Sequence, residues 1–506
     1  MQAENKSRWW FILAPLCLPL FFVLHGINQH FGLIPWKDVV ILLAWYLFVT
    51  SAVIIFSARI LKHGYKSTFF VYFVLIVFFF FGVFKDFTKQ FGWLSFITSY
   101  KILLPAIAMS FIVVPWLLKK SPGTFRRTSL LLSLIVFVNL AVEAGLLIYN
   151  TFTKVPASYD FGDPQHQLIR DVRIADTSSR PHIFWIVLDE YSSSAVLREN
   201  WGFHNPVDTV LRNKGFFVAD SATSPYNYTQ YSLLGTLDMQ YLPEFSTRDK
   251  ITYRDIVRSQ LSLEENNVVS VLLQAGYKVQ NFSVTHMNGI PASPFTRFGS
   301  QTRMLIDNET LPGRTSLDIG WNFPYLFMSP NERDSAIATE VYTSLHALND
   351  STYRSSMHRL KQHAAGSDPQ AFLIHTMFSH DPFLYDADGK VNVQLKQGVL
   401  PERYIPTIQY TNTVLNRMID SIQTWYAGKE FTIVIQGDHG FKFRETDPKI
   451  KTEMCKIFYA VYCSDGNYQA WHHRVNSVNT FRLLFNKYLG TRFDELPAHS
   501  FTLYYQ

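Results

Sequence analysis

An aspartate and a histidine stand side by side where an apolar segment of the chain ends. Asp438 and His439 follow the β-branched run 431–435 and lie between Gly437 and Gly440. A carboxylate oxygen and an imidazole nitrogen together suit a borderline divalent metal ion. The glycines allow backbone and substrate to come close to the pair. The pattern predicts part of a metal site, and the alternative is a structural turn between two glycines.

Two earlier apolar runs end in residues of similar chemistry. Asp189 and Glu190 follow the run 182–188, and His380 follows the run 371–375. In an open α/β sheet, the carboxyl ends of the parallel strands are the usual place for a site. We therefore expect these residues to lie near the aspartate–histidine pair. The competing interpretations are a helix cap for the acidic pair and a turn residue for His380.

A threonine at the start of a predicted helix supplies a hydroxyl group. Thr229 lies in the polar and aromatic segment 224–233, which leads into that helix. A hydroxyl at a helix N-terminus is well placed as a nucleophile and beside a bound anion. The alternative is an ordinary N-cap residue, which is the usual role of threonine at such a position.

Two residue pairs near the C-terminus leave their roles open. His472 and His473 either lie on the surface or contact the substrate. Cys455 and Cys463 flank a strand-like run. A straight strand would hold them roughly 26 Å apart at about 3.3 Å per residue, which is too far for a disulfide. A disulfide between these cysteines therefore requires a bend.

A sheet is needed to position these side chains, and the pattern from residue 181 onward predicts one. Strand-like runs alternate with helical periodicity at 262–275 and about 404–427. This alternation predicts an α/β domain with a largely parallel central sheet over 181–506, after a polar linker at 151–180. The strand-like runs are 182–188, 215–219, 278–282, 371–375, 431–435 and 457–462.

The first 150 residues have the pattern of a membrane domain with five helical spans. Each of five apolar runs comes near the roughly 20 residues that a helix needs to cross a bilayer. Glu143 lies within the fifth run and either faces neighbouring helices or acts near a lipid headgroup. No small-residue cleavage site follows the first run, so we expect it to remain as an anchor. The runs are 9–27, 38–58, 67–84, 101–118 and 128–149.

The distribution of charge predicts the orientation of the chain. Residues 1–150 contain 13 Lys and Arg and 4 Asp and Glu, a net charge of +9, so the whole-chain +6 leaves −3 for residues 151–506. The basic balance therefore belongs to the membrane domain and does not indicate nucleic-acid binding. With the N-terminus in the cytoplasm, nine Lys and Arg lie inside and four outside, as the positive-inside rule requires. We expect a multi-pass protein of the plasma (inner) membrane with residues 181–506 on its extracytoplasmic, periplasmic side.

The chain resembles the alkaline phosphatase–sulfatase superfamily at the residues described above. Within that superfamily it looks most like the five-span membrane phosphotransferases, which are the phosphoethanolamine transferases and the lipoteichoic acid synthases. The resemblance covers both halves of the chain. The matching pieces are residues 186–190, the Thr229 loop, and residues 379–382, 410–412, 437–440 and 477–482.

The resemblance implies a metal-dependent enzyme with Thr229 as the nucleophile and a divalent ion, Zn or Mn, as the cofactor. It implies that His380 contacts the substrate phosphate or a second metal ion, with Glu190 as a further candidate for this role. The Cys/Ser-x-Pro-x-Arg motif of sulfatases is missing after position 229, which argues against sulfate-ester hydrolysis. The implied metal ligands are Asp189, Thr229, Asp438 and His439.

The implied reaction moves a phospholipid-derived headgroup, of the phosphoethanolamine or glycerolphosphate type, to a lipid or glycan acceptor in the cell envelope. One alternative is a hydrolase of phosphate or sulfate esters with water as the acceptor. Another is a membrane sensor or scaffold without catalysis, although the presence of nucleophile and ligands together speaks against it. The sequence leaves the donor, the acceptor and the oligomeric state open.

Overall fold

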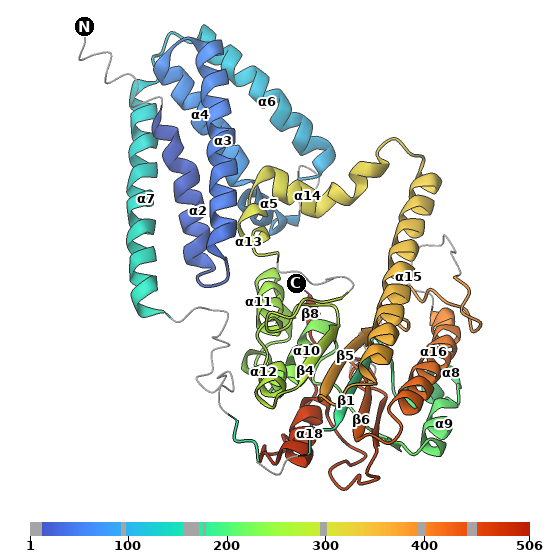
Figure 1. Cartoon of the computed structure of the whole chain (residues 1–506). Coiled ribbons are helices and arrows are strands. Elements are labelled where there is room, and N and C mark those ends of the chain that lie inside the picture. The colour runs from blue at the N-terminus through green and yellow to red at the C-terminus, as the bar shows by residue number, and fades with distance from the viewer. Residues whose placement is uncertain are drawn as a thin grey trace. The chain divides into compact units, whose positions relative to one another are not determined.

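The chain forms two compact units in the computed structural model (Figure 1). The first unit consists of residues 1–158 and 301–326, and the second of residues 159–300 and 327–506. Residues 301–326 therefore belong to the first unit, although the sequence around them belongs to the second. The structure describes residues 13–92, 98–154, 172–175, 179–293, 301–391, 401–442 and 453–505.

Apolar helices make up most of the first unit. They are η1 (Ala14–Leu16), α2 (Cys17–Gln29), α3 (Trp36–Leu61), α4 (Gly64–Phe79), α5 (Phe81–Lys89), α6 (Tyr100–Lys120) and α7 (Arg126–Thr153). Within the described residues, α3, α6 and α7 are long and apolar enough to cross a membrane. Helices α4 and α5 pass the same test only together, with a bend of 56° between them.

These helices provide three membrane spans by length and composition, or four if the bent pair is one span. The first of the five predicted runs, 9–27, appears as the shorter apolar stretch Ala14–Gln29. Residues 1–12, where that run begins, lie outside the described residues.

Glu143 on α7 faces the neighbouring helix α2. Its carboxylate lies 2.7 Å from His25 Nδ1 and accepts a hydrogen bond of 2.7 Å from Asn28 Nδ2. Asn150 donates in turn to Asn28 at 3.1 Å. A carboxylate among apolar helices needs such partners, because an unpaired charge there is costly. This placement agrees with the interpretation of Glu143 as a residue that faces neighbouring helices.

The segment 301–326 packs against the helices of the first unit. It contains α13 (Met304–Asp307), α14 (Leu311–Ile319) and η4 (Gly320–Tyr325). The Tyr46 hydroxyl on α3 donates to Asp307 at 2.7 Å, and the Lys85 ammonium on α5 pairs with Asp318 at 2.7 Å. Specific polar contacts therefore tie this late segment to helices formed much earlier in the chain.

A six-stranded sheet forms the centre of the second unit. Its strands are β1 (His182–Leu188), β2 (Phe217–Val218), β4 (Lys278–Phe282), β5 (Gln370–Thr376), β6 (Phe431–Gly437) and β7 (Tyr459–Cys463), in the order β2-β7-β6-β1-β5-β4. β1 runs parallel to both of its neighbours, β5 and β6. β7 runs antiparallel to β6 and β2, so the sheet is mixed but mostly parallel. Two further short strands, β3 (Lys250–Ile251) and β8 (Tyr504–Tyr505), pair separately.

Helices lie on both sides of this sheet (Figure 1). They include α8 (Ser194–Trp201), α9 (Val207–Asn213), α10 (Thr229–Asp238), α11 (Tyr253–Leu263), α12 (Asn267–Gln274), α15 (Pro330–His363), α16 (Tyr404–Trp425) and α18 (Thr480–Leu489). The helix predicted at 404–427 is present as α16. The helix predicted at 262–275 is present as α12, but it begins later than predicted, because the Asn266 side chain accepts a hydrogen bond from Val269 N at 3.0 Å and caps the helix there.

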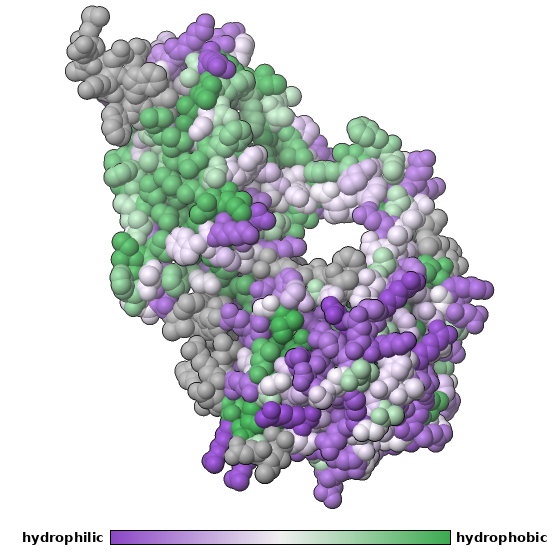
Figure 2. Space-filling model, viewed as in Figure 1, coloured by the Kyte–Doolittle hydropathy of each residue, from purple (hydrophilic) through white to green (hydrophobic). Residues whose placement is uncertain are grey.

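The surfaces of the two units differ in character (Figure 2). Side chains on the visible face of the first unit are mostly hydrophobic, whereas those on the second unit are mostly hydrophilic. In the second unit the large apolar side chains lie inside, with Phe184 and Trp185 of β1 fully buried. This contrast matches a membrane-embedded first unit and a water-exposed second unit.

His182 at the start of β1 gives the second unit a predictable response to acid. The ring is buried, and its Nδ1 accepts a hydrogen bond from Gln370 N at 3.2 Å. Burial, helped by the charge of Lys429, lowers the pKa of His182 from 6.5 to about 4. The folded state therefore favours the neutral ring. The resulting stability is fully present above pH 6.5 and is lost as the pH falls toward 4.

We expect His182→Asn to remove part of this acid sensitivity. The Asn carbonyl can still accept the hydrogen bond from Gln370 N but does not titrate. Between pH 7.5 and pH 5 the melting temperature of the wild type should fall more than that of the variant, with at most roughly 3 kcal/mol at stake. Thermal unfolding followed by intrinsic fluorescence measures both. An equal fall in the two proteins would show that His182 does not cause the sensitivity.

Candidate active site

The parallel register brings the ends of three strands to one edge of the sheet. Leu188, the last residue of β1, pairs with Gly437 on β6 and with Thr376 on β5. Asp189 and Asp438, each the next residue along its strand, therefore start side by side. Asp189 N also donates to Thr376 O at 3.0 Å, which extends the pairing by one step.

Three buried side chains converge at this edge. Asp189, Asp438 and His439 each offer a ligand atom, and these atoms all lie within 4.8 Å of one another. His439 Nε2 lies 3.7 Å from Asp189 Oδ1 and 3.6 Å from Asp438 Oδ2. The structure therefore brings together the strand ends that the sequence pattern singled out.

The oxygen atoms of this cluster fit a bound cation. The Oδ1 atom of Asp189 and the Oδ2 atom of Asp438 are buried and have no hydrogen-bond partner among the described residues, while Asp189 Oδ2 lies 3.1 Å from His375 Nε2. Buried carboxylates without partners are unfavourable, unless they are paired or coordinate a metal ion. Two carboxylates and one imidazole, with a hydroxyl beside them, form a donor set that suits a divalent metal ion.

Backbone contacts orient Asp438 and His439 toward the cluster. Asp438 Oδ1 accepts hydrogen bonds from Glu190 N at 3.0 Å and from His439 N at 2.8 Å, which leaves Oδ2 facing the other ligands. His439 Nδ1 lies 2.7 Å from Gly440 O, which leaves Nε2 facing inward. Gly437 is required because a Cβ atom there would lie 2.5 Å from a backbone carbonyl oxygen, that of Tyr191.

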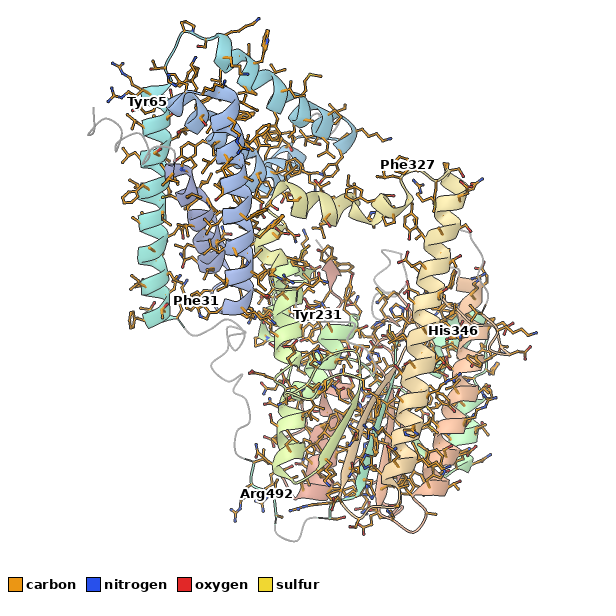
Figure 3. All side chains as sticks on the ribbon, turned by 45° about the horizontal axis from the view of Figure 1, so that its top comes forward. Phe31, Tyr65, Tyr231, Phe327, His346 and Arg492 are labelled. Carbon is orange, nitrogen blue, oxygen red and sulfur yellow. The ribbon has the colours of Figure 1, made fainter. Side chains whose placement is uncertain are left out.

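Thr229 joins the cluster from the start of α10. Its Oγ1 lies 3.3 Å from His439 Nε2. Thr229 is the first residue of the helix, and the N-cap position belongs to Tyr228. The hydroxyl is therefore not the N-cap group considered as the alternative. Tyr231, two residues further along α10, is buried and anchors this helix in the core (Figure 3).

Glu190 and His380 belong to a second group beside the first. Glu190, His380 and Asp381 offer ligand atoms within 4.8 Å of one another. Glu190 Oε2 accepts a hydrogen bond from Asp381 N at 3.2 Å. His380 Nδ1 lies 2.9 Å from Asp381 Oδ1, and its Nε2 lies 3.9 Å from Asp189 Oδ1. His380 thus has one nitrogen held by a neighbour and the other directed at the first cluster.

The electrostatics of these groups are strongly perturbed. Burial would raise the pKa of Asp189, but the imidazoles of His380, His375 and His439 hold it well below its usual range. Burial would lower the pKa of His380, but the carboxylate of Asp189 and the contact with Asp381 raise it to about 9. The site therefore holds an ionised carboxylate and a charged imidazole at neutral pH.

Lys442 brings a further positive charge to the site, and the sequence analysis missed it. Its backbone N donates to Glu190 Oε1 at 2.9 Å, and its ammonium lies 5.5 Å from the ring centre of Tyr228. Burial would lower the pKa of Lys442, but nearby carboxylates, Glu190 and Asp189 first among them, raise it. Lys442 lies three residues after His439, and nothing in the sequence other than its charge indicated that it belongs to the site.

His375 was also missed, because it is the last residue of the predicted run 371–375 and was counted as part of the strand and not as a site residue beyond it. Its Nε2 atom lies 3.1 Å from Asp189 Oδ2, and both side chains are buried. A histidine in this position can orient a ligating carboxylate without contacting the substrate.

Replacing His375 should weaken metal binding without removing it. We expect His375→Gln to lower the affinity for zinc by roughly 10- to 100-fold, the usual effect of losing a group that orients a ligand. Competition with a chromogenic chelator measures the affinity. His473→Gln serves as the control, since His473 is exposed and paired with Asp220 at 2.9 Å. An unchanged affinity in His375→Gln would contradict this role.

The other open residues lie elsewhere in the second unit. His472 is exposed and lies 2.5 Å from Glu495, and His473 likewise pairs with an exposed acidic residue. Cys455 and Cys463 are both buried free thiols. The strand β7 occupies most of the run between these cysteines, as the straight-strand argument expected.

Two helix segments that carry the family resemblance, 410–412 and 477–482, contact residues next to the site. Asn412 Oδ1 on α16 accepts a hydrogen bond from the Tyr191 hydroxyl at 2.5 Å, next to the acidic pair in sequence. Thr480 Oγ1 on α18 donates to Gln436 Oε1 at 2.9 Å, two residues before Asp438. These contacts fix the backbone on either side of the cluster.

Several solved structures are similar to this chain. The lipooligosaccharide phosphoethanolamine transferase A from Neisseria meningitidis, an integral membrane protein, covers 95% of this chain and 94% of its own, at 12% identity and a TM-score of 0.39. The C-terminal periplasmic domain of EptC from Escherichia coli, in complex with Zn, covers 63% and 85%, at 13% identity and 0.38. A protein in the alkaline phosphatase superfamily from Vibrio parahaemolyticus covers 65% and 72%, at 12% identity and 0.38. No curated protein matches.

A family model described as Sulfatase matches residues 181–480, which is more than half of the chain. The matched range contains every residue of the site, from Asp189 to Lys442. The second unit is therefore an α/β domain of the alkaline phosphatase–sulfatase superfamily, and the resemblance seen in the motifs is confirmed. Within this superfamily, the chain belongs to the sulfatase family.

Proposed function

We propose that this protein is a membrane-anchored, metal-dependent phosphoryl-group transferase that moves a phospholipid-derived headgroup to an acceptor in the cell envelope. The observation that carries this proposal is the Thr229 hydroxyl, held at a helix start beside a buried cluster of metal-ligand type. The missing Cys/Ser-x-Pro-x-Arg motif of sulfatases favours phosphorus over sulfur chemistry. The motif resemblance supports a headgroup of the phosphoethanolamine or glycerolphosphate type, and a lipid or glycan as the acceptor.

Asp189, Thr229, Asp438 and His439 would hold the metal ion, Zn or Mn. When bound, the ion lowers the pKa of the threonine hydroxyl and polarises a phosphoryl oxygen. The unpartnered carboxylate oxygens of the two aspartates support this assignment. Glu190 instead uses both carboxylate oxygens to accept hydrogen bonds from Asp381 N and Lys442 N, so we assign it to holding these two loops.

In the first half of the reaction, Thr229 Oγ1 releases its proton to water and forms a bond to the phosphorus of the donor lipid. The bond from phosphorus to the diacylglycerol oxygen breaks, and His380 Nε2 gives that leaving oxygen a proton. Lys442 offsets the negative charge of the phosphoryl group. In the second half, an acceptor hydroxyl gives its proton to His380 and attacks the phosphorus of the phosphothreonine. The bond from phosphorus to Thr229 Oγ1 breaks, and this oxygen takes up a proton from water, which restores the Thr229 hydroxyl.

We also propose that the helical unit crosses the membrane five times and leaves residues 181–506 on the extracytoplasmic side. The three clear spans and the positive-inside bias of Lys and Arg support this topology. In this arrangement the catalytic domain meets donor lipids in the outer leaflet of the plasma membrane.

The experiment that tests the function is a product analysis with the full chain in lipid vesicles. Phosphatidylethanolamine or phosphatidylglycerol carries a labelled headgroup, and a lipid extract of the cell envelope serves as the acceptor. We expect diacylglycerol to appear together with labelled acceptor. Free labelled headgroup phosphate would indicate a hydrolase with water as the acceptor. The absence of diacylglycerol with either donor, in metal-loaded protein, would overturn the proposal in favour of a scaffold.

A further inference from the structure

Part of helix α5 has the reverse polarity of a helix on the surface of a soluble protein. Val83, Phe84 and Phe87 are exposed, at 49% to 57%, while Lys85 is only 6% exposed. The Lys85 ammonium lies 3.1 Å from the ring centre of Tyr100 and pairs with Asp318. The charge of Lys85 is thus turned inward and satisfied, and three apolar side chains are turned out, beside the exposed Asp86 and Lys89.

The segment 311–326 shows the same reversal. On α14, Arg314 pairs with Asp86 of α5, and Asp318 accepts hydrogen bonds from Lys85 and from the Tyr100 hydroxyl at 2.7 Å. The exposed residues are mostly apolar. Leu317, Trp321, Phe323 and Leu326 are 45% to 63% exposed.

The sequence of this segment is unusual for a loop in water. No charged residue occurs from 319 to 331, and the stretch is rich in aromatic side chains. The next residue after η4 and Leu326, Phe327, is fully exposed at the turn before α15 (Figure 3). Tryptophan and tyrosine are enriched where a membrane meets water, because their rings are apolar at one end and polar at the other. Trp321 and Tyr325 fit this pattern.

Helices α5 and α14 pack against each other and are joined by the ion pairs of Lys85 with Asp318 and of Arg314 with Asp86. We define the interfacial platform as α5 together with residues 311–326. We propose that this platform lies in the headgroup region of the lipid bilayer and that its partner is the membrane itself. The proposal does not depend on the reaction that the second unit performs.

Continuity favours lipid over a protein partner. The platform belongs to the same compact unit as α3, α6 and α7, whose exposed side chains are also largely apolar. Because α5 turns by 56° away from α4, it does not continue as a straight span. A helix with an apolar outer face at such a bend is suited to lie in the plane of the interface.

Difference quenching of Trp321 tests the proposal. The full chain is placed in nanodiscs whose lipids carry bromine either near the headgroup or near the end of the acyl chain. Bromine quenches tryptophan on contact. The emission of Trp321 is obtained as the difference between the wild type and Trp321→Phe. Bromine near the headgroup should quench this emission at least twofold more than bromine near the end of the acyl chain.

Two matched variants calibrate this measurement. Trp471→Phe removes a nearly buried tryptophan of the second unit, and its component should not be quenched. Trp45→Phe removes an exposed tryptophan of α3, and its component should be quenched by lipid. Phe323→Trp, made in the Trp321→Phe chain, should restore a tryptophan emission that bromine near the headgroup quenches more than bromine near the end of the acyl chain.

Two results would overturn the proposal. One is that lipid bromine quenches the emission of Trp321 no more than that of Trp471. This result would also be found if two chains in one nanodisc covered each other's platform. The other is stronger quenching by the deep label, which would place the segment inside the hydrocarbon core.

Discussion

Thr229→Ala should lower headgroup transfer at least about a thousandfold, because the proposed nucleophile is then absent. The substitution removes one hydroxyl and one methyl group from a nearly buried position at the start of α10. The alanine keeps the helix start, so the fold should persist. Diacylglycerol release from the labelled donor, measured on purified full chain, gives the rate, and a melting curve checks the fold. Labelled donor should leave no phosphate on residue 229 in the variant, whereas the wild type should carry it transiently.

Two further variants separate the role of the hydroxyl from that of the side chain. Thr229→Ser retains the hydroxyl and should keep measurable transfer. Thr236→Ala removes a buried threonine from the same helix, where its hydroxyl contacts Ser477 at 3.2 Å, and should affect stability more than rate. If Thr229→Ala transferred the headgroup at the wild-type rate, the covalent route would be excluded.

Asp438→Asn should empty the metal site. The amide oxygen can still accept the hydrogen bonds from Glu190 N and His439 N, so the loop keeps its shape. An amide NH2 group then replaces the unpartnered Oδ2 atom, so the site loses a negative charge and an oxygen ligand. We expect metal affinity to fall by at least about a hundredfold, since loss of a direct ligand exceeds the effect of losing its neighbours. Metal analysis of purified protein should then find about one ion per wild-type chain and almost none in the variant.

Removing the metal from the wild type should also lower its melting temperature, because a ligand bound only by the folded state stabilises that state. Chelation should therefore destabilise the wild type and leave Asp438→Asn unchanged. Asp381→Asn is the matched control, since Asp381 belongs to the second group of potential ligands. It should retain the ion. Equal metal content in wild type and Asp438→Asn would contradict the ligand assignment, and loss only in Asp381→Asn would move the metal to the second group.

The sheet and the strand-end residues could be predicted because they leave strong local signals. A strand buried on both faces appears as a continuous apolar run, and each of the six predicted runs overlaps a strand. Parallel neighbours then bring their carboxyl ends to one edge. For this reason Asp189 and Asp438 could be placed together before their register was known. The reversal of β7 left no such signal, since its direction depends on how the chain enters it.

The parts that were missed depend on long-range contacts. His375 reads as an ordinary strand residue until Asp189 is placed 3.1 Å away on the adjacent strand. The membership of residues 301–326 in the first unit likewise depends on partners more than 200 positions earlier, such as Tyr46 for Asp307. The error in the start of the helix predicted at 262–275 has a local cause, because Asn266 interrupts an apolar periodicity that continues on both sides.

The exchange of chain between the two units also affects the order of synthesis. Tyr46 is made 261 residues before its partner Asp307, and Lys85 is made 233 residues before Asp318. At ribosomal speeds of about 5–20 residues per second, these partners emerge roughly 10 to 50 seconds apart. The early helices therefore stay in the bilayer without these partners until about the first half of the second unit and then residues 301–326 have been synthesised.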